Sequence, residues 1–227
     1  MTRPLRLILF DVDGTLVDSQ ADIVASMQAA FDAVGHPFPA RETVLGIVGL
    51  SLDVAMTRLA PGLAVRDHDR MVAAYKDSYV RLRAEKGAAS SPLFPGARAV
   101  LDALGVQEDY LLGVATGKSR RGLDALFDSH DLRDVFVTEQ VADHHPSKPH
   151  PSMVMAAMAE TGVDPQNTVV IGDTVFDMQM ARAAGAHGIG VGCGYHPAED
   201  LRGHARHVID GFDQLPGCLD ELWESMT

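Results

Sequence analysis

The spacing of apolar positions changes along the chain and predicts a different kind of structure in each part. Residues 5–10 form a short, mostly apolar run, which is typical of a strand buried on both faces. Between Ser19 and about Gly87 the apolar positions recur every three or four residues, and this spacing predicts helices only. The expected helices cover about 19–35, 53–59 and 67–83.

After Pro92 helices and strands alternate. The predicted strands are 110–115, 134–138, 168–171 and 188–191, and the predicted helices are 97–104, 118–127, 151–161 and 176–184. Alternation of this length predicts parallel β-α-β units with helices on both faces of one sheet. The expected fold class is therefore α/β. It has a parallel-sheet, Rossmann-like core of residues 1–17 and 92–227, and an inserted all-helical domain of residues 18–91.

Charge and hydropathy narrow the range of partners. The formal net charge of −12 argues against nucleic acid, because binding to a phosphate backbone needs a basic face. An anionic substrate must then be attracted by local cations, and this already suggests a bound metal. No stretch approaches the roughly 18 apolar residues that span a bilayer, and the N-terminal apolar run is too short for a signal peptide. We expect a cytoplasmic protein without membrane contact, either a monomer or a small homo-oligomer.

Cysteine and histidine do not form a metal site in this sequence. Cys193 and Cys218 have neither metal-ligand spacing nor the pattern of a disulfide framework. His144, His145 and His150 invite a zinc interpretation, but adjacent histidines do not easily share one tetrahedral ion and no companion ligands stand at finger spacing. We interpret them as loop residues.

Two aspartates directly follow the first predicted strand, where ligands of open α/β sheets bind. Asp11 and Asp13 are two residues apart, so in extended backbone their side chains lie on the same side. Two close carboxylates repel each other unless a cation or a shared proton intervenes. Mg²⁺ accepts one or two carboxylates together with water and phosphate oxygens. A polar turn is the structural alternative, but an Asp-x-Asp-Gly-Thr string after an apolar strand is highly specific.

Three more polar clusters follow later strands. Thr116 and Gly117 offer a hydroxyl and free N–H groups at the start of a helix, which suits a phosphate. Lys148 places a compact positive charge on a loop before a helix. Asp173 follows a strand, and Asp177 stands one helical turn later. Each cluster alone has a structural interpretation as a helix cap, a loop lysine or a first-turn acid.

Together, the four clusters resemble the motifs of the haloacid-dehalogenase superfamily, and in particular its phosphoglycolate-phosphatase-like branch. The resemblance rests on residues 11–19, Thr116, residues 147–149 and residues 172–177, in the order that the family has. Residues 18–91 stand where this branch has a small helical cap domain. The resemblance implies a Mg²⁺-dependent phosphatase for a small phosphorylated metabolite. Phosphoglycolate is the first candidate, followed by pyrophosphate, sugar phosphates and nucleoside monophosphates.

The resemblance also implies a role for each cluster. Asp11 would attack phosphorus to form an aspartyl-phosphate, and Asp13 would act as the acid and base. Carboxylates of the first and fourth clusters would bind Mg²⁺, with a contribution from the Asp13 backbone carbonyl. The second and third clusters would hold the phosphoryl oxygens. The residues implied are Asp11, Asp13, Asp173 and Asp177 for the metal, and Thr116, Gly117 and Lys148 for the substrate.

Several rival functions remain open at this point. The dehalogenase branch needs no acid/base aspartate, so Asp13 counts against it. The β-phosphoglucomutase branch typically has a cap arginine after a Gly-x-Ser, where this chain has Leu52. The phosphonatase branch uses a cap lysine, and neither Lys76 nor Lys86 stands in a recognisable motif. An inorganic pyrophosphatase and a non-catalytic scaffold for a phosphorylated ligand are further alternatives, although the scaffold should have lost a catalytic group.

The helical part offers candidates for contact with the leaving group. By the resemblance, residues 49–52 are the segment expected to approach the site. Gly117 departs from the branch, which often has an asparagine there, and this departure bears on the substrate. Cations that could meet a substrate carboxylate are Arg41, Arg58, Lys76, Arg81, Arg120 and Arg121.

Overall fold

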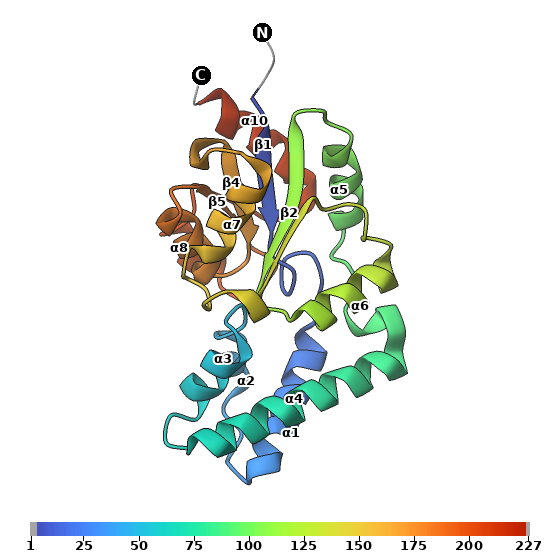
Figure 1. Ribbon diagram of the computed structural model, residues 1–227, viewed down its shortest axis with the longest axis vertical. Helices are drawn as coiled ribbons and strands as arrows, with labels where there is room; N and C mark the ends of the chain where they lie inside the picture. The colour runs from blue at the N-terminus through green and yellow to red at the C-terminus, as the bar shows by residue number, and fades with distance from the viewer. Residues whose placement is uncertain (1–3, 226–227) are drawn as a thin grey trace.

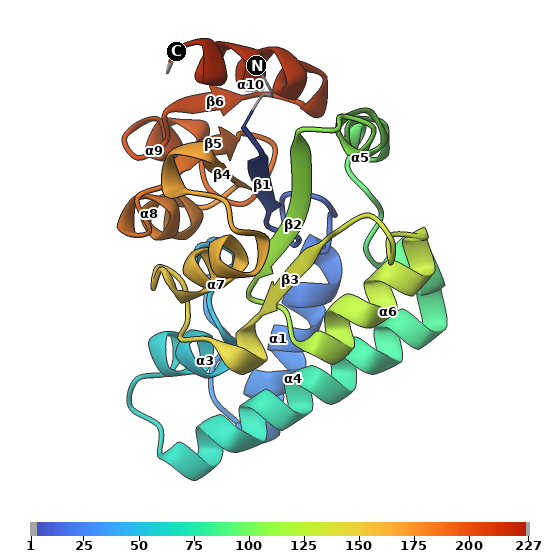
Figure 2. The same ribbon diagram turned by 45° about the horizontal axis from the view of Figure 1, so that its top comes forward.

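The computed structural model describes residues 4–225 and has a six-stranded sheet at its centre. The strands are β1 (Arg6–Phe10), β2 (Tyr110–Thr116), β3 (Thr138–Val141), β4 (Thr168–Gly172), β5 (His187–Val191) and β6 (His207–Ile209). Their order is β3-β2-β1-β4-β5-β6, and every neighbouring pair is parallel. Figure 1 labels the four central strands, and Figure 2 labels all six. The predicted α/β class is confirmed. Because the strands are parallel, the segments that follow them meet at one edge of the sheet.

Helices cover both faces of this sheet (Figure 2). One face carries α5 (Ala97–Gly105), α6 (Arg120–His130) and α10 (Leu215–Glu224), and the other carries α7 (Ser152–Thr161) and α8 (Val175–Ala183). The short α9 (Ala198–Arg202) connects β5 to β6. Alternate side chains of β1 enter two separate cores, Ile8 and Phe10 on the first face and Leu7 and Leu9 on the second. A strand covered on both sides needs apolar residues at every position, which explains the uninterrupted run.

The third strand lies later in the chain than its apolar pattern predicts. Residues 134–138 were expected to form it, but β3 spans the mostly polar Thr138–Val141. Val135 and Phe136 pack into the core instead, and the ring of Phe136 stacks on Phe127 at a centroid distance of 5.2 Å. The prediction is wrong because the apolar pattern there marks packing of the connection, while β3 is a short edge strand.

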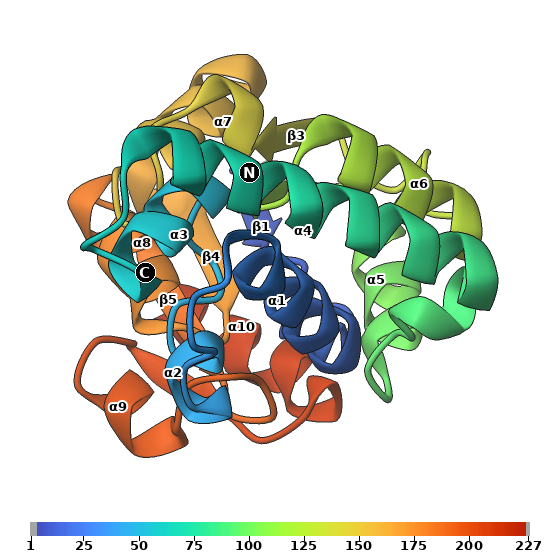
Figure 3. The same ribbon diagram turned by 90° about the horizontal axis from the view of Figure 1, so that it is seen from below.

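Between β1 and α5 the described chain contains helices and no strand of the sheet, as expected. These are α1 (Gln20–Val34), α2 (Arg41–Leu45), α3 (Leu52–Leu59), α4 (Val65–Lys86) and the 3₁₀ turn Gly87–Ser90. We call residues 18–91 the helical insert. It has its own apolar cluster around Phe31, Met56 and Met71, and it lies across the carboxyl edge of the sheet (Figure 3). No helix within residues 4–225 has the length and apolar character needed to cross a membrane.

The chain enters and leaves the helical insert through two adjacent segments. The Asp18 backbone N–H donates to the Pro92 carbonyl at 2.9 Å, and Val17 forms an antiparallel bridge with Leu93. Next to this junction, the buried carboxylate of Asp22 accepts hydrogen bonds from Ser90 and from Lys86. The first and last parts of the insert are therefore hydrogen-bonded to each other beside the core. We call the paired segments 17–18 and 92–93 the junction.

Candidate active site

The four polar clusters of the sequence meet at the carboxyl edge of the sheet. Asp11 follows β1, Thr116 ends β2, Lys148 lies on the loop before α7, and Asp173 follows β4. Beside them, a pocket of about 580 Å³ opens between the strand ends and the helical insert. We call it the interdomain pocket. Asp11, Asp13, Thr116 and Gly117 line its core side.

Lys148 is completely buried between two carboxylates. Its ammonium Nζ lies 2.8 Å from Asp11 Oδ1 and 2.6 Å from Asp177 Oδ1, and all three side chains are at most 1% exposed. Burial alone would lower the pKa of Lys148, but the charges of Asp11 and Asp177 outweigh it and raise that pKa above its ordinary value. Lys148 is therefore a permanent positive charge beside Asp11.

One lysine does not balance the negative charge around it. Ligand atoms of Asp11, Asp173 and Asp177 lie within 4.8 Å of one another, and all three residues are buried. Burial, only partly opposed by Lys148, raises the pKa of the Asp11 carboxyl to about 7. Burial and the nearby charge of Asp11 likewise raise the pKa of Asp173 well above its usual range. Asp11 Oδ2 has no hydrogen-bond partner within residues 4–225. Buried carboxylates of this kind need a cation, and an all-oxygen cluster suits Mg²⁺.

The two aspartates after β4 are held in different ways. Asp173 accepts from the Thr15 hydroxyl at 2.8 Å and from the Tyr195 backbone N–H at 2.8 Å. Asp177 Oδ2 accepts from the hydroxyl and the backbone N–H of Thr174, which caps α8. Since Lys148 occupies its other oxygen, Asp177 contributes charge and holds Lys148 in place. Asp173 is not the helix cap, because Thr174 caps α8. Asp177 is a first-turn acid that completes a capping box with Thr174, but it is buried and pairs with Lys148 as well.

Asp13 is oriented by two partners that bind its two oxygens separately. Ser19 donates its hydroxyl to Oδ1 at 2.5 Å, and the Lys118 ammonium lies 2.8 Å from Oδ2. The Ser19 hydroxyl also contacts the Tyr195 hydroxyl at 2.9 Å. The Asp13 carboxylate is not a member of the three-carboxylate cluster and lines the interdomain pocket. Its proposed metal contact through the backbone carbonyl stays a prediction.

Gly117 marks a close approach of the helical insert to the core. A Cβ at Gly117 would lie 2.7 Å from the Gly49 carbonyl oxygen and 3.0 Å from that of Leu50. Nearby, the Ser51 backbone N–H donates to the Ser147 hydroxyl at 2.8 Å. Residues 49–51 thus contact the segments that carry Thr116 and Lys148, where the sequence placed them. The close approach gives a physical reason for glycine at this position, since any side chain would push the insert away.

We expect Gly117→Ala to lower kcat/KM for phosphate release about tenfold or more. The methyl group must displace the backbone of Gly49, and overpacking of this kind costs about 1–3 kcal/mol, where 1.4 kcal/mol corresponds to about tenfold in rate. The control is Gly62→Ala, because a Cβ there would have no neighbour within 4 Å. Wild-type kcat/KM in Gly117→Ala would show that this approach is not required.

The family comparison agrees with this geometry. A model of the family described as haloacid dehalogenase-like hydrolase matches residues 8–191, which run from the middle of β1 to the end of β5 and include all four polar clusters. The chain belongs to the haloacid dehalogenase-like hydrolases. The matched region of this hydrolase therefore contains both the carboxyl edge of the sheet and the helical insert.

Curated relatives and solved structures of this hydrolase family agree over almost the whole chain. "Probable phosphatase IndB" of Dickeya dadantii is 35% identical, with 95% of this chain and 94% of the relative covered. A phosphoglycolate phosphatase of Pseudomonas putida is 32% identical, with coverage of 95% and 80%. The crystal structure of a hydrolase from Pseudomonas syringae has a TM-score of 0.84 at 26% identity, covering 95% of this chain and 98% of that one. The prediction of a phosphatase is confirmed at this level: the chain is a phosphoric monoester hydrolase.

The structure shows which of the cations proposed in the sequence analysis line the interdomain pocket of this hydrolase. Of those in the helical insert, Lys76 lines the interdomain pocket, and so does Arg83, which the sequence analysis did not name. Arg41 instead binds Gln20, and Arg58 lies over the ring of Phe176. Of the two cations on α6, Arg121 lines the pocket and Arg120 pairs with Glu139.

Five residues that orient the carboxylates were not proposed from sequence. They are Thr15, Ser19, Lys118, Thr174 and Tyr195. Four of them stand in or next to the motifs of this hydrolase, so their position gave a usable signal. Tyr195 follows the carboxyl end of β5, and the rule that ligands bind beyond strand ends would have included it.

Proposed function

We propose that the chain is a Mg²⁺-dependent phosphatase that hydrolyses a small phosphomonoester through an aspartyl-phosphate on Asp11. One observation carries the proposal. Asp11 is buried beside the Lys148 ammonium, with Oδ2 unpartnered among the described residues and two further carboxylates close by. A nucleophilic carboxylate needs a free oxygen and a way to neutralise charge, and this arrangement supplies both.

In the first step a carboxylate oxygen of Asp11 attacks phosphorus and the bond from phosphorus to the leaving oxygen breaks. Asp13 gives a proton to that oxygen, and Lys148 offsets the negative charge on Asp11. In the second step Asp13 takes a proton from water, the water oxygen bonds to phosphorus, and the phosphorus–Asp11 bond breaks to release phosphate. Thr116, Gly117 and Lys148 hold the phosphoryl oxygens. Asp11 and Asp173, with Asp13 and Asp177 in support, would hold Mg²⁺, which would supply positive charge against the repulsion between carboxylates and phosphate.

The helical insert, residues 18–91, acts in this proposal as a cap domain on a core of residues 1–17 and 92–227. Its separate apolar cluster and its paired junction with the core support this division. Its contacts with Gly117 and Ser147 support a role in closing the site against water. Closure over the phosphate would also place insert side chains against the leaving group.

The substrate remains a proposal of its own, with phosphoglycolate as the first candidate. Relatives named phosphoglycolate phosphatase support it. We expect phosphate release from at least one ester in the presence of Mg²⁺ and its loss after addition of EDTA. Binding of phosphate esters without release would indicate a scaffold. Interconversion of sugar phosphates without net release would indicate a mutase, and release from pyrophosphate alone a pyrophosphatase.

We expect Mg²⁺ to raise the melting temperature of the wild type and to have little effect on Asp173→Asn. A ligand at 100 times its Kd adds about 2.7 kcal/mol to the free energy of unfolding, or about 5–10 °C for a protein of this size. The substitution removes one charge from the cluster of three carboxylates. The control is Asp220→Asn on the exposed side of α10. An unchanged Mg²⁺ shift in Asp173→Asn would place the metal elsewhere.

A further inference from the structure

The interdomain pocket is larger than glycolate requires. Its volume is about 580 Å³. Phosphoglycolate has about nine non-hydrogen atoms, and even at the roughly 30 Å³ that a water molecule occupies in the liquid it fills about 270 Å³. By the same measure the pocket takes about twenty non-hydrogen atoms, which is the size of a nucleoside monophosphate. The space therefore fits a leaving group several times larger than glycolate.

The wall that the helical insert gives to this pocket is apolar and aromatic. Ile23, Met27, Val48, Leu50 and Ala55 line it and are themselves mostly buried. Tyr75 and Tyr79 of α4 also line it, and their rings stack at a centroid distance of 5.9 Å with an interplanar angle of 23°. A flat ring of the leaving group gains contact area and stacking energy on such a wall.

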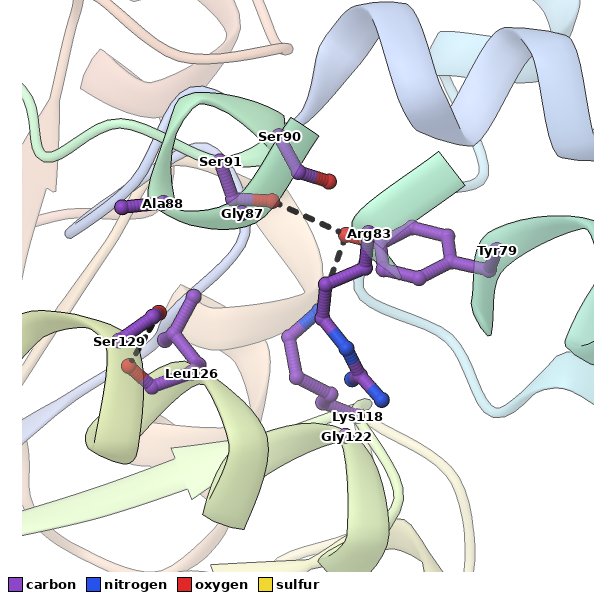
Figure 4. A pocket seen from close by; sticks show the side chains of 10 residues that line it. All are labelled: Tyr79, Arg83, Gly87, Ala88, Ser90, Ser91, Lys118, Gly122, Leu126 and Ser129. Carbon is purple, nitrogen blue, oxygen red and sulfur yellow. Dashed lines mark hydrogen bonds between the residues drawn. The ribbon is translucent and has the colours of Figure 1, made fainter. Parts of the chain in front are cut away.

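Tyr79 is fixed in position by both parts of the molecule. The Tyr79 hydroxyl lies 3.2 Å from the Ser91 hydroxyl next to the junction (Figure 4). The Lys118 ammonium lies 3.4 Å from the Tyr79 hydroxyl and 4.9 Å from the centre of the Tyr79 ring. Lys118 also pairs with Asp13. The aromatic wall is thus held at a set position relative to the group that protonates the leaving oxygen, and it needs little ordering when a substrate binds.

The cations that line this pocket differ in their partners. Lys118 is already paired with Asp13. Lys76 and Arg121 are exposed, at the rim of the pocket. Together with Arg83, they have no carboxylate partner in an ion pair within residues 4–225. They attract an anionic substrate to a protein of net charge −12.

We infer that the preferred substrate carries a flat, ring-bearing leaving group of nucleoside size that packs on Tyr75 and the apolar wall of the helical insert. The inference rests on the proposed phosphatase activity and replaces phosphoglycolate as the first candidate. It assigns to Tyr75 the role of a specificity-determining residue, through contact with the ring and without a part in proton transfer.

The test compares kcat/KM for a nucleoside 5′-monophosphate, ribose 5-phosphate and phosphoglycolate, with Mg²⁺. We expect the nucleoside monophosphate to exceed both others by about tenfold or more, the scale of one base–aromatic stack. Ribose 5-phosphate separates the contribution of the base from that of the sugar, because it has the sugar and the phosphate but lacks the base. Highest kcat/KM for phosphoglycolate would overturn the inference and leave the phosphatase proposal intact. Absence of phosphate release from every ester would instead overturn the phosphatase proposal.

A substitution tests the wall directly. In Tyr75→Ala the ratio of kcat/KM for the nucleoside monophosphate to that for phosphoglycolate should fall about tenfold. Both substrates are measured on the same variant, so a loss of folded protein leaves the ratio unchanged. The matched control is Tyr110→Ala, a partly buried tyrosine on β2 that lies outside the pocket lining. An unchanged ratio in Tyr75→Ala would contradict the inference.

Discussion

Asp11→Asn should reduce kcat for phosphate release by about 10⁴-fold or more, the scale that follows removal of a catalytic nucleophile. An amide is a far weaker nucleophile than a carboxylate, while its size and shape preserve the packing around the site. Steady-state phosphate release with Mg²⁺ measures the loss, and a matched Asp220→Asn protein shows that asparagine itself does not harm the enzyme. Activity within tenfold of the wild type would end the proposal of an aspartyl-phosphate on this residue.

The same substitution should stabilise the metal-free protein, by about 1–3 kcal/mol at pH 8, because it removes one of three buried carboxylates that share one lysine. The folded-state pKa of Asp11 is about 7 against an ordinary 3.8. The folded protein therefore binds more protons than the unfolded chain between these values, and stability falls as pH rises through this window. The advantage of Asp11→Asn should accordingly be larger at pH 8 than at pH 5. Urea unfolding in EDTA measures it, and lower stability of the variant at pH 8 would contradict the account.

Lys148→Met should lower the free energy of unfolding by about 3–5 kcal/mol, more than the other substitutions proposed. Removal of one partner of a buried ion pair leaves buried charges uncompensated. Asp11 and Asp177 both lose their only cation in the side-chain contacts described for residues 4–225. Methionine keeps much of the volume, so the effect reports charge more than packing. Urea unfolding in EDTA is again the measurement, with phosphate release expected to be lost as well.

A double variant separates charge from packing at Lys148. Asp11→Asn with Lys148→Met should lose less stability than the sum of the two single effects predicts, because fewer carboxylates then lack a cation. Strictly additive free energies would mean that Lys148 stabilises the protein through packing alone.

The sequence predicted which polar residues meet at the carboxyl edge of the sheet, and the reason is physical. Asp11 and Asp173 follow strands that are mostly apolar, and the carboxyl ends of parallel strands must meet. β3 was misplaced because an edge strand need not be apolar, while Val135 and Phe136 beside it pack into the core. The periodicity of apolar residues indicates which side chains are buried. It therefore fails to locate a strand where the residues that form the backbone hydrogen bonds of the sheet are not the buried apolar ones.

Contacts between the helical insert and the core lay beyond the sequence. Arg41 and Lys76 are equivalent as sequence, since both are cations of the predicted helical insert, and only the folded structure shows that Lys76 lines the pocket whereas Arg41 binds Gln20. Likewise the pairing of Lys118 with Asp13 joins residues from two strand ends. A single sequence shows the chemical type of each residue, such as Lys118 or Asp13, but not the direction in which its side chain points.

The junction of the helical insert has an evolutionary consequence. Because Val17 and Leu93 lie side by side, the two ends of the insert almost meet. An insert of different length could therefore be exchanged between these two points without a change in the sheet, provided that Ser19, which orients Asp13, is kept. New substrates can then arise by recombination at two neighbouring points, while the strand ends that carry Asp11 and Thr116 are inherited unchanged.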